Sequence, residues 1–311
     1  MTLLRTLLAG EPRALARAIS LVERGDPAGE KLVVQASAHA GTAAITGITG
    51  PPGVGKSTLV GALVRELRTR DDRVAVLSVD PTSPFTGGAL LGDRIRLADH
   101  FLDEAVFIRS LASRGSLGGL AAAVRPAALL ADAAGYSHVL IETVGIGQAE
   151  VDIAGQADTT VVVLMPGAGD TLQAIKAGLM EIPDVLVVNK ADHPRADDLV
   201  RELRRTARFR ARTAPIVKTN ALTGDGIAEL ADVIAGHRSR EHGRRSAGRQ
   251  TAAQREIVRL ATDGLRVRIE RLLHGGDEGR AALEAVAAGH RTPESAARWL
   301  IAELTGEGGN R

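Results

Sequence analysis

The stretch GPPGVGKS at residues 50–57 decides the fold of this 311-residue chain. It fits the pattern GxxxxGK[ST], in which a glycine-rich loop turns its backbone N–H groups toward phosphate oxygens and the next helix adds its positive N-terminal end. The flanks agree with this pattern. Residues 44–49 read as a short buried strand, and residues 57–70 carry leucine and valine at helical spacing. A strand, a loop and a helix in this order predict a P-loop rather than an ordinary glycine-rich turn with an incidental lysine.

The side chains of this loop have separate predicted roles. Lys56 is expected to reach the β- and γ-phosphates of a nucleotide, and the hydroxyl of Ser57 to coordinate Mg²⁺. Thr58 is expected near the α-phosphate. The remaining candidates for nucleotide binding in the loop are Gly50, Pro51, Pro52, Gly53, Val54 and Gly55.

A second short string, NKAD at residues 189–192, predicts which base is bound. It follows the aliphatic run 184–188, a predicted central strand, and ligands of open α/β sheets bind at the carboxyl ends of such strands. Asp192 can accept two hydrogen bonds from the ring N–H and the exocyclic amine of guanine, whereas adenine offers no such pair. Lys190 is expected to lie along the base, and Asn189 to tie this loop to the P-loop. Alone the string also fits an ordinary turn, but its spacing from the P-loop favours GTP and GDP as ligands.

The composition predicts a cytoplasmic enzyme. The chain is 44% hydrophobic and 24% charged, and no apolar run is long enough to span a bilayer, so no membrane partner is expected. The first residues do not resemble a signal peptide. The sequence contains no cysteine, which excludes disulfides, thiolate metal sites and cysteine nucleophiles.

No nucleic-acid partner is expected. The isoelectric point is 9.3, but the net charge is only +2, and the high value arises because the basic residues are mostly arginine. Aromatic residues make up 2% of the chain, which is too few for platforms on which bases could stack.

The pattern along the chain divides it into three parts. Residues 1–41 form a predicted N-terminal helical arm, and residues 42–237 a predicted α/β P-loop GTPase domain whose mostly parallel central sheet is flanked by helices. Residues 238–311 form a predicted C-terminal helical extension. It starts with a charged linker at 239–250, and helices follow at 252–273, 280–288 and 293–304. His237, just before this linker, and His242 within it are expected to be solvated.

Further polar residues follow the strands at the edge of the sheet where catalytic groups are expected. Asp80 and Glu142 each end a strand, where they could hold Mg²⁺ or its waters. Gly145 has no side chain to keep its N–H from the γ-phosphate. The loop 81–96, which contains Asp93, is too long for a mere connection. Solvated turn residues and strand-end caps are the alternative reading.

Five strings together resemble the MeaB/ArgK family of P-loop GTPases, which are chaperones of adenosylcobalamin-dependent acyl-CoA mutases. They are GPPGVGKST at 50–58, VDPTSPFTGGALLGDRIRL at 79–97, IETVGIGQAEVDIAGQAD at 141–158, PGAGDTLQAIKAGLMEI at 166–182 and VVNKAD at 187–192. The resemblance implies a homodimer held partly by the C-terminal helices. It also implies that GTP binding and hydrolysis gate two processes, the loading of adenosylcobalamin into a mutase and the protection of that mutase.

The resemblance also assigns roles to residues. It implies that Asp80, Asp93 and Glu142 serve the Mg²⁺ and γ-phosphate region, and that residues 93–97 and 142–150 are the moving switches. Residues 167–178, with Asp170 and Lys176, resemble an additional switch that contacts the mutase, although a single lysine stands where the family often has two.

Another departure from the family lies in the loop that supports guanine. The family commonly has Thr-Ser-Ala, whereas this chain has Thr219, Asn220 and Ala221. The backbone N–H of Ala221 is expected to bind the guanine oxygen, and Asn220, Ala221 and Leu222 complete the predicted nucleotide site.

The expected chemistry is in-line attack of water on the γ-phosphorus, with Lys56 and Mg²⁺ neutralising charge. The residue that orients the water is left open among Asp93, Glu142 and Gln148, because Gln148 does not directly follow Gly145. Two other functions share the core. One is a kinase or ATPase serving amino-acid transport, and the other is a GTPase that assembles metal centres. Asp192 argues against the first, and the lack of cysteine against the second.

Overall fold

The structure of the chain is a computed structural model that describes residues 2–80, 100, 102–112, 123–143, 153, 156–167, 183–207 and 214–305. For residues 80, 112, 207, 241–256, 259, 260, 263 and 267 it describes the backbone alone. The chain divides into two compact units, residues 1–244 and residues 245–311.

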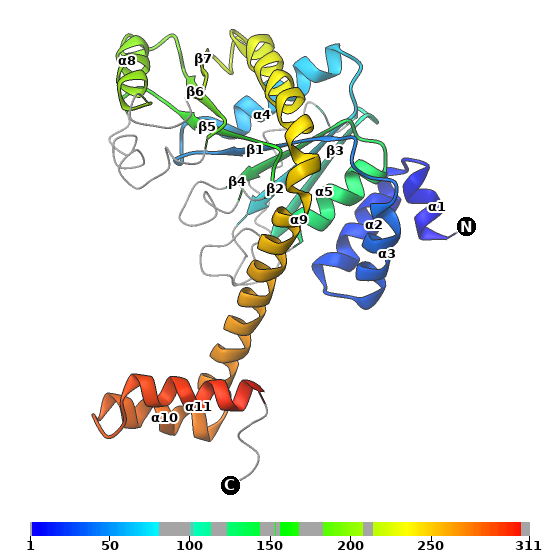
Figure 1. The fold of residues 1–311 in the computed structure, drawn as a ribbon. Coiled ribbons are helices and arrows are strands. Elements are labelled where there is room, and N and C mark those ends of the chain that lie inside the picture. The colour runs from blue at the N-terminus through cyan, green and yellow to red at the C-terminus, as the bar shows by residue number, and fades with distance from the viewer. Residues whose placement is uncertain are drawn as a thin grey trace. The chain divides into compact units, whose positions relative to one another are not determined.

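A seven-stranded sheet with the order β3-β2-β4-β1-β5-β6-β7 forms the centre of the first unit, and every neighbouring pair is parallel (Figure 1). This confirms the predicted α/β fold of a P-loop GTPase. The strands predicted at 44–49 and 184–188 are present, the second of them one residue later in the chain. The strands are β1 (Ala44–Thr49), β2 (Val74–Asp80), β3 (Val106–Ala112), β4 (His138–Thr143), β5 (Thr159–Leu164), β6 (Val185–Asn189) and β7 (Ile216–Thr219).

Two helices cover one face of the sheet, and every second side chain along the strands points toward them. Val74 and Val76 pack into the same buried cluster as α4 (Lys56–Thr69) and the start of α9 (Ile227–His274). The intervening residues Ala75 and Leu77 point to the opposite face. Burial on both faces explains why these strands read as continuous apolar runs.

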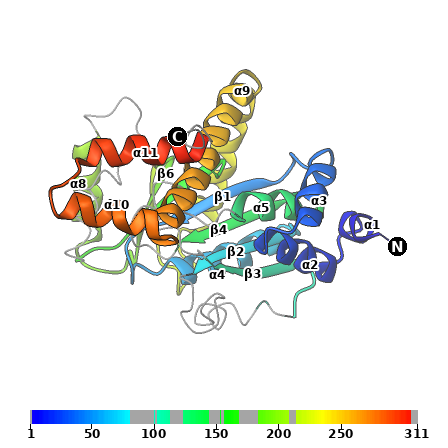
Figure 2. The ribbon, with the colours of Figure 1, turned by 90° about the horizontal axis from the view of Figure 1, so that it is seen from below.

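The opposite face is covered by α5 (Val124–Ala133), by α8 (Ala196–Ala207) and by the N-terminal helices, which gather beside α5 (Figures 1 and 2). Those N-terminal helices are α1 (Leu3–Leu8), α2 (Pro12–Glu23) and α3 (Pro27–Ser37). Leu7, Leu15 and Ile19 are fully buried, so the N-terminal helices share one core with the sheet.

The connection from α3 to β1 is held by the buried carboxylate of Asp132 on α5. This carboxylate accepts hydrogen bonds from the backbone N–H groups of Gly41, Thr42 and Ala43, and from the Thr42 hydroxyl. One carboxylate therefore provides hydrogen-bond acceptors for three backbone N–H groups that are shielded from water. The N-terminal helices are thereby fixed to the sheet.

Two expectations for the segment after β7 are wrong. The predicted linker at 239–250 is helical, because α9 is one helix of 48 residues. Its arginine, alanine and glutamine residues are good helix formers, and each glycine costs only about 1 kcal/mol inside a helix that continues on both sides. His237 is 7% exposed rather than solvated, with Nδ1 2.9 Å from Thr159 Oγ1 and Nε2 3.2 Å from Asp184 Oδ1. The side chain of His242 lies outside the described residues.

The second unit contains the end of α9, α10 (Asp277–Ala287) and α11 (Pro293–Thr305). The predicted helices at 280–288 and 293–304 are therefore present. Within the described part of the chain, no helix is both long enough and apolar enough to cross a membrane.

Candidate nucleotide-binding site

Backbone geometry explains the glycines of the loop between β1 and α4. Gly50 has φ +144°, and a Cβ there would lie 2.1 Å from the carbonyl oxygen of Val163 on β5. Gly55 has φ +93°, and its Cβ would lie 2.6 Å from Nδ2 of Asn189. A side chain at either position would collide with a neighbouring element. The two glycines thus let the loop close tightly over the central strands.

Lys56 begins α4 and lies across this loop. Its side chain is buried, and Nζ donates hydrogen bonds to the carbonyl oxygens of Gly50 at 2.8 Å and Pro51 at 3.0 Å. An ammonium group held against the loop backbone is close to where loop N–H groups can gather phosphate oxygens. Lys56 can therefore exchange these carbonyls for the phosphates of a nucleotide.

Ser57 and Glu142 meet beside the loop. The Ser57 hydroxyl donates to Oε1 of Glu142 at 2.6 Å, and both residues are buried. Sheet register produces this contact, because β4 lies next to β1 and pairs Glu142 with Ile48. Mg²⁺ prefers oxygen ligands and is usually held by one or two protein groups together with phosphates. A buried hydroxyl and carboxylate in contact fit that requirement.

The side chains of the other predicted metal and switch residues are not among those that the structure describes. Asp80 ends β2 at the same edge of the sheet as Glu142, but its side chain is not described. Outside the described residues lie Asp93, Gly145, Gln148, Asp170 and Lys176. Among the side chains that the structure does describe, no group of three or more His, Asp or Glu could hold a metal ion.

Asn189 joins the loop after β6 to the P-loop, as the sequence predicts. Its Nδ2 donates to the carbonyl oxygen of Val54 at 2.9 Å, and its Oδ1 accepts from the Thr219 hydroxyl and from the Ala221 N–H, both at 3.2 Å. One buried amide thus connects the ends of β1, β6 and β7. The contribution of Thr219 is not evident in the sequence, because nothing in a short strand shows which hydroxyl meets an amide thirty residues away.

The residues predicted to read the base lie at the rim of this arrangement. Lys190, with φ +56°, extends its Nζ to 3.3 Å from the carbonyl oxygen of Gly53. Asp192 is exposed and lies against Asn220, whose Nδ2 is 3.1 Å from Oδ1 of Asp192. Leu222 is 84% exposed beside them. The structure therefore brings the P-loop, NKAD and the segment 219–222 together at one edge of the sheet.

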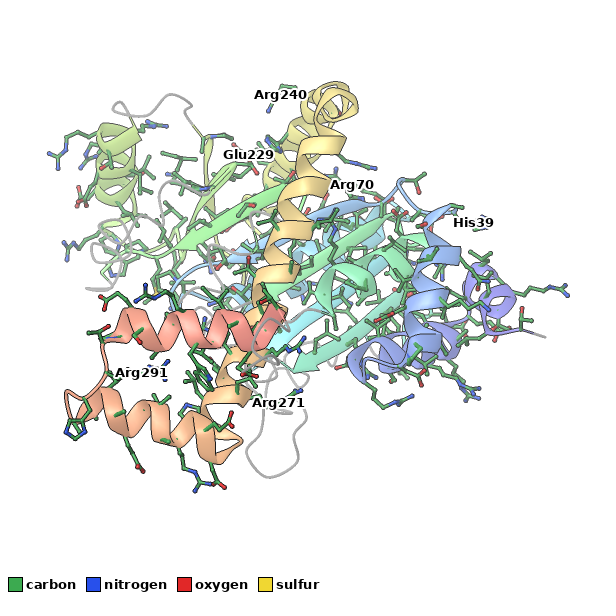
Figure 3. All side chains as sticks on the ribbon, turned by 60° about the horizontal axis from the view of Figure 1, so that its bottom comes forward. His39, Arg70, Glu229, Arg240, Arg271 and Arg291 are labelled. Carbon is green, nitrogen blue, oxygen red and sulfur yellow. The ribbon has the colours of Figure 1, made fainter. Side chains whose placement is uncertain are left out.

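A separate cavity of 630 Å³ lies where β7 begins, and so at the opposite edge of the sheet. Figure 3 shows Glu229 and Arg240, two residues of its wall, on the first half of α9. Arg70, also labelled there, bonds the cavity residue Asp232 at 2.6 Å. The cavity is not part of the candidate nucleotide site. Its lining residues are Pro215, Glu229, Asp232, Val233, Gly236 and Arg240.

Comparisons with known proteins find GTPases among the proteins that this chain resembles. A model of the protein family described as "Methylmalonyl Co-A mutase-associated GTPase MeaB" matches residues 15–272. A putative GTPase of Pyrococcus abyssi is 43% identical over 318 residues, which cover 98% of this chain and 97% of that protein. The mitochondrial methylmalonic aciduria type A homolog of Caenorhabditis elegans is 40% identical over 205 residues, which cover 61% of this chain and 51% of that protein.

A solved structure resembles the chain over nearly its whole length. The crystal structure of an LAO/AO transport system kinase has a TM-score of 0.71 and 28% sequence identity, and the match covers 97% of this chain and 96% of that one. Fold and sequence therefore point to the same group of proteins.

Proposed function

The chain belongs to the MeaB family of methylmalonyl-CoA mutase-associated GTPases. We propose that it uses GTP to gate the loading of adenosylcobalamin into an acyl-CoA mutase and the protection of that mutase. The observation that carries the nucleotide part is the Asn189 amide, which holds the phosphate loop and the base-reading loops together. The mutase part is supported by the family description and by the methylmalonic aciduria type A homolog among the relatives.

The reaction expected of a family GTPase is hydrolysis of GTP to GDP and phosphate. A water oxygen attacks the γ-phosphorus while the bond to the β–γ bridging oxygen breaks, and the charge left on that oxygen needs stabilisation. In this proposal Lys56 and the loop N–H groups provide it. Mg²⁺, when bound by Ser57 and Glu142, supplies positive charge beside the β- and γ-phosphates. Asp80 and Asp93 remain proposed helpers of that metal.

The proposal extends to the switches and to assembly. We place the mutase contact at Asp170 and Lys176, and the water-orienting group among Asp93, Glu142 and Gln148.

A homodimer held by the C-terminal extension is supported by exposed apolar side chains on α9, namely Ile257, Val258 and Leu265. Of the hydrophobic residues described in the second unit, Ala282 is the buried one. A second copy would cover such a surface.

Capture of the partner tests the mutase assignment. The full chain, immobilised with a non-hydrolysable GTP analogue, is expected to retain the cobalamin-binding subunit of an acyl-CoA mutase, and to retain less of it with no nucleotide. The physical reason is that the switches adopt one arrangement only around a γ-phosphate. Equal retention of the mutase and of an unrelated cobalamin-free enzyme would contradict the assignment.

A second candidate is the transfer of phosphate to an amino-acid transport component, which the name of the transport system kinase structure suggests. The two candidates differ in the acceptor of the γ-phosphate, since a GTPase gives it to water and a kinase to a side chain. Radiolabelled γ-phosphate recovered as inorganic phosphate, in an amount equal to the GDP formed, supports the GTPase. Label recovered on protein supports the kinase.

A further inference from the structure

We propose that Asn220 is a positioning residue that holds the Asp192 carboxylate in the orientation that reads guanine, and so sets how strictly this chain selects guanine over hypoxanthine. The inference rests on the proposed role of Asp192. It concerns the position at which this chain has asparagine instead of the serine that its family commonly carries.

A direct contact links the two side chains across two loops. Asn220 Nδ2 donates to Asp192 Oδ1 at 3.1 Å, although the residues are 28 positions apart in the sequence. Asp192 itself is exposed on the loop after β6, where a lone carboxylate would rotate freely. Asn220 therefore fixes a group that its own loop leaves exposed.

The neighbours of Asn220 determine which way its amide points. The backbone N–H groups of Leu222 and Thr223 lie 3.1 and 3.5 Å from the atom assigned as Oδ1, and an N–H can only donate. The acceptor oxygen of the amide must face them. Its NH₂ group is then left for Asp192, whose ionised carboxylate can only accept. Both assignments agree with one orientation of the amide.

The backbone around Asn220 is also held in place. The Asn220 N–H donates to the carbonyl oxygen of Asp225 at 3.0 Å, and its own carbonyl oxygen accepts from the N–H of Gly224 at 2.9 Å. The turn closes at Gly226, where a Cβ would lie 2.0 Å from the carbonyl oxygen of Lys218. An anchored donor of this kind orders the carboxylate before the base arrives, which reduces the entropy lost on binding.

The orientation of the Asp192 carboxylate matters more for binding guanine than for binding hypoxanthine. Guanine presents a ring N–H and an exocyclic amine, so both carboxylate oxygens must lie in the plane of the base. Hypoxanthine lacks the amine and presents the ring N–H alone, so a rotated carboxylate still serves it. Loss of the Asn220 contact should therefore weaken the binding of guanine nucleotides more than that of inosine nucleotides.

Titration of the full chain with GDP and with IDP tests the proposal. In Asn220→Asp, an oxygen still faces the N–H groups of Leu222 and Thr223, but the donor to Asp192 is replaced by a second carboxylate. The ratio of GDP affinity to IDP affinity is expected to fall about 10-fold, as for a lost hydrogen bond to a charged group. Asn220→Ala removes the donor without adding a charge, and it is expected to lower the ratio in the same direction.

Thr223→Val is the matched control, because the Thr223 hydroxyl bonds Asp225 and the Asn220 carbonyl within the same loop but does not touch Asp192. It should leave the ratio unchanged. An unchanged ratio in both Asn220 variants, or an equal fall in Thr223→Val, would overturn the role of Asn220 and leave guanine reading by Asp192 intact. A wild-type protein that binds GDP and IDP equally would instead overturn guanine reading itself.

Discussion

Replacing Asp192 with asparagine is expected to reverse the base preference of the protein, so that it binds xanthosine triphosphate more tightly than GTP. A carboxylate accepts from the ring N–H and the amine of guanine, whereas an asparagine amide offers donors that match the carbonyl oxygen of xanthine. Polar groups that lose their water on binding but find no matching partner should cost GTP about 100-fold or more in affinity. Competition of each triphosphate against a fluorescent guanine nucleotide measures the two affinities.

The control for this variant is Asp197→Asn. Asp197 is an exposed acid on α8 that bonds Lys218 at 3.0 Å, and its loss should leave both affinities unchanged. If Asp192→Asn bound GTP as tightly as the wild type and gained nothing toward the xanthine nucleotide, Asp192 would not be the residue that reads guanine.

Replacing Lys56 with alanine is expected to lower the turnover of GTP by about 100- to 1000-fold, the usual effect of removing one donor from a charge-stabilising site. Lys56 is the buried lysine whose ammonium group the structure holds against the phosphate loop. Release of inorganic phosphate at saturating GTP measures the loss, and a thermal melt reports whether the loop still folds without the two carbonyl contacts.

Lys218→Ala is the matched control for Lys56, because it removes an exposed lysine of the same domain whose partner is Asp197. Turnover should stay at the wild-type value. Wild-type turnover in a folded Lys56→Ala protein would show that this lysine does not stabilise the transition state.

The sequence predicted the strand, loop and helix around residues 50–57 well, because its motifs act over short distances. The P-loop glycines, Lys56 and Ser57 lie within eight residues, and the aliphatic runs before them identify the strands. The contact between Asn189 and the P-loop was also predictable, since strands that are parallel bring their carboxyl ends to one edge.

Long-range contacts between side chains were not predictable in the same way. The hydrogen bond from Asn220 to Asp192 depends on how two loops approach each other, and no periodicity records that. The sequence predicted that His237 is solvated, because the arginines and glycines after it indicated a linker. Extension of α9 through that segment instead places His237 against the starts of β5 and β6.

Phosphate release by the wild-type protein, followed with GTP and with ATP in the presence and absence of an adenosylcobalamin-dependent acyl-CoA mutase, tests the central claim most directly. The expected result is slow hydrolysis of GTP that the mutase accelerates, with no comparable hydrolysis of ATP. Equal rates for the two nucleotides, or a basal GTP rate as fast as the rate with mutase, would contradict a GTPase that serves the mutase.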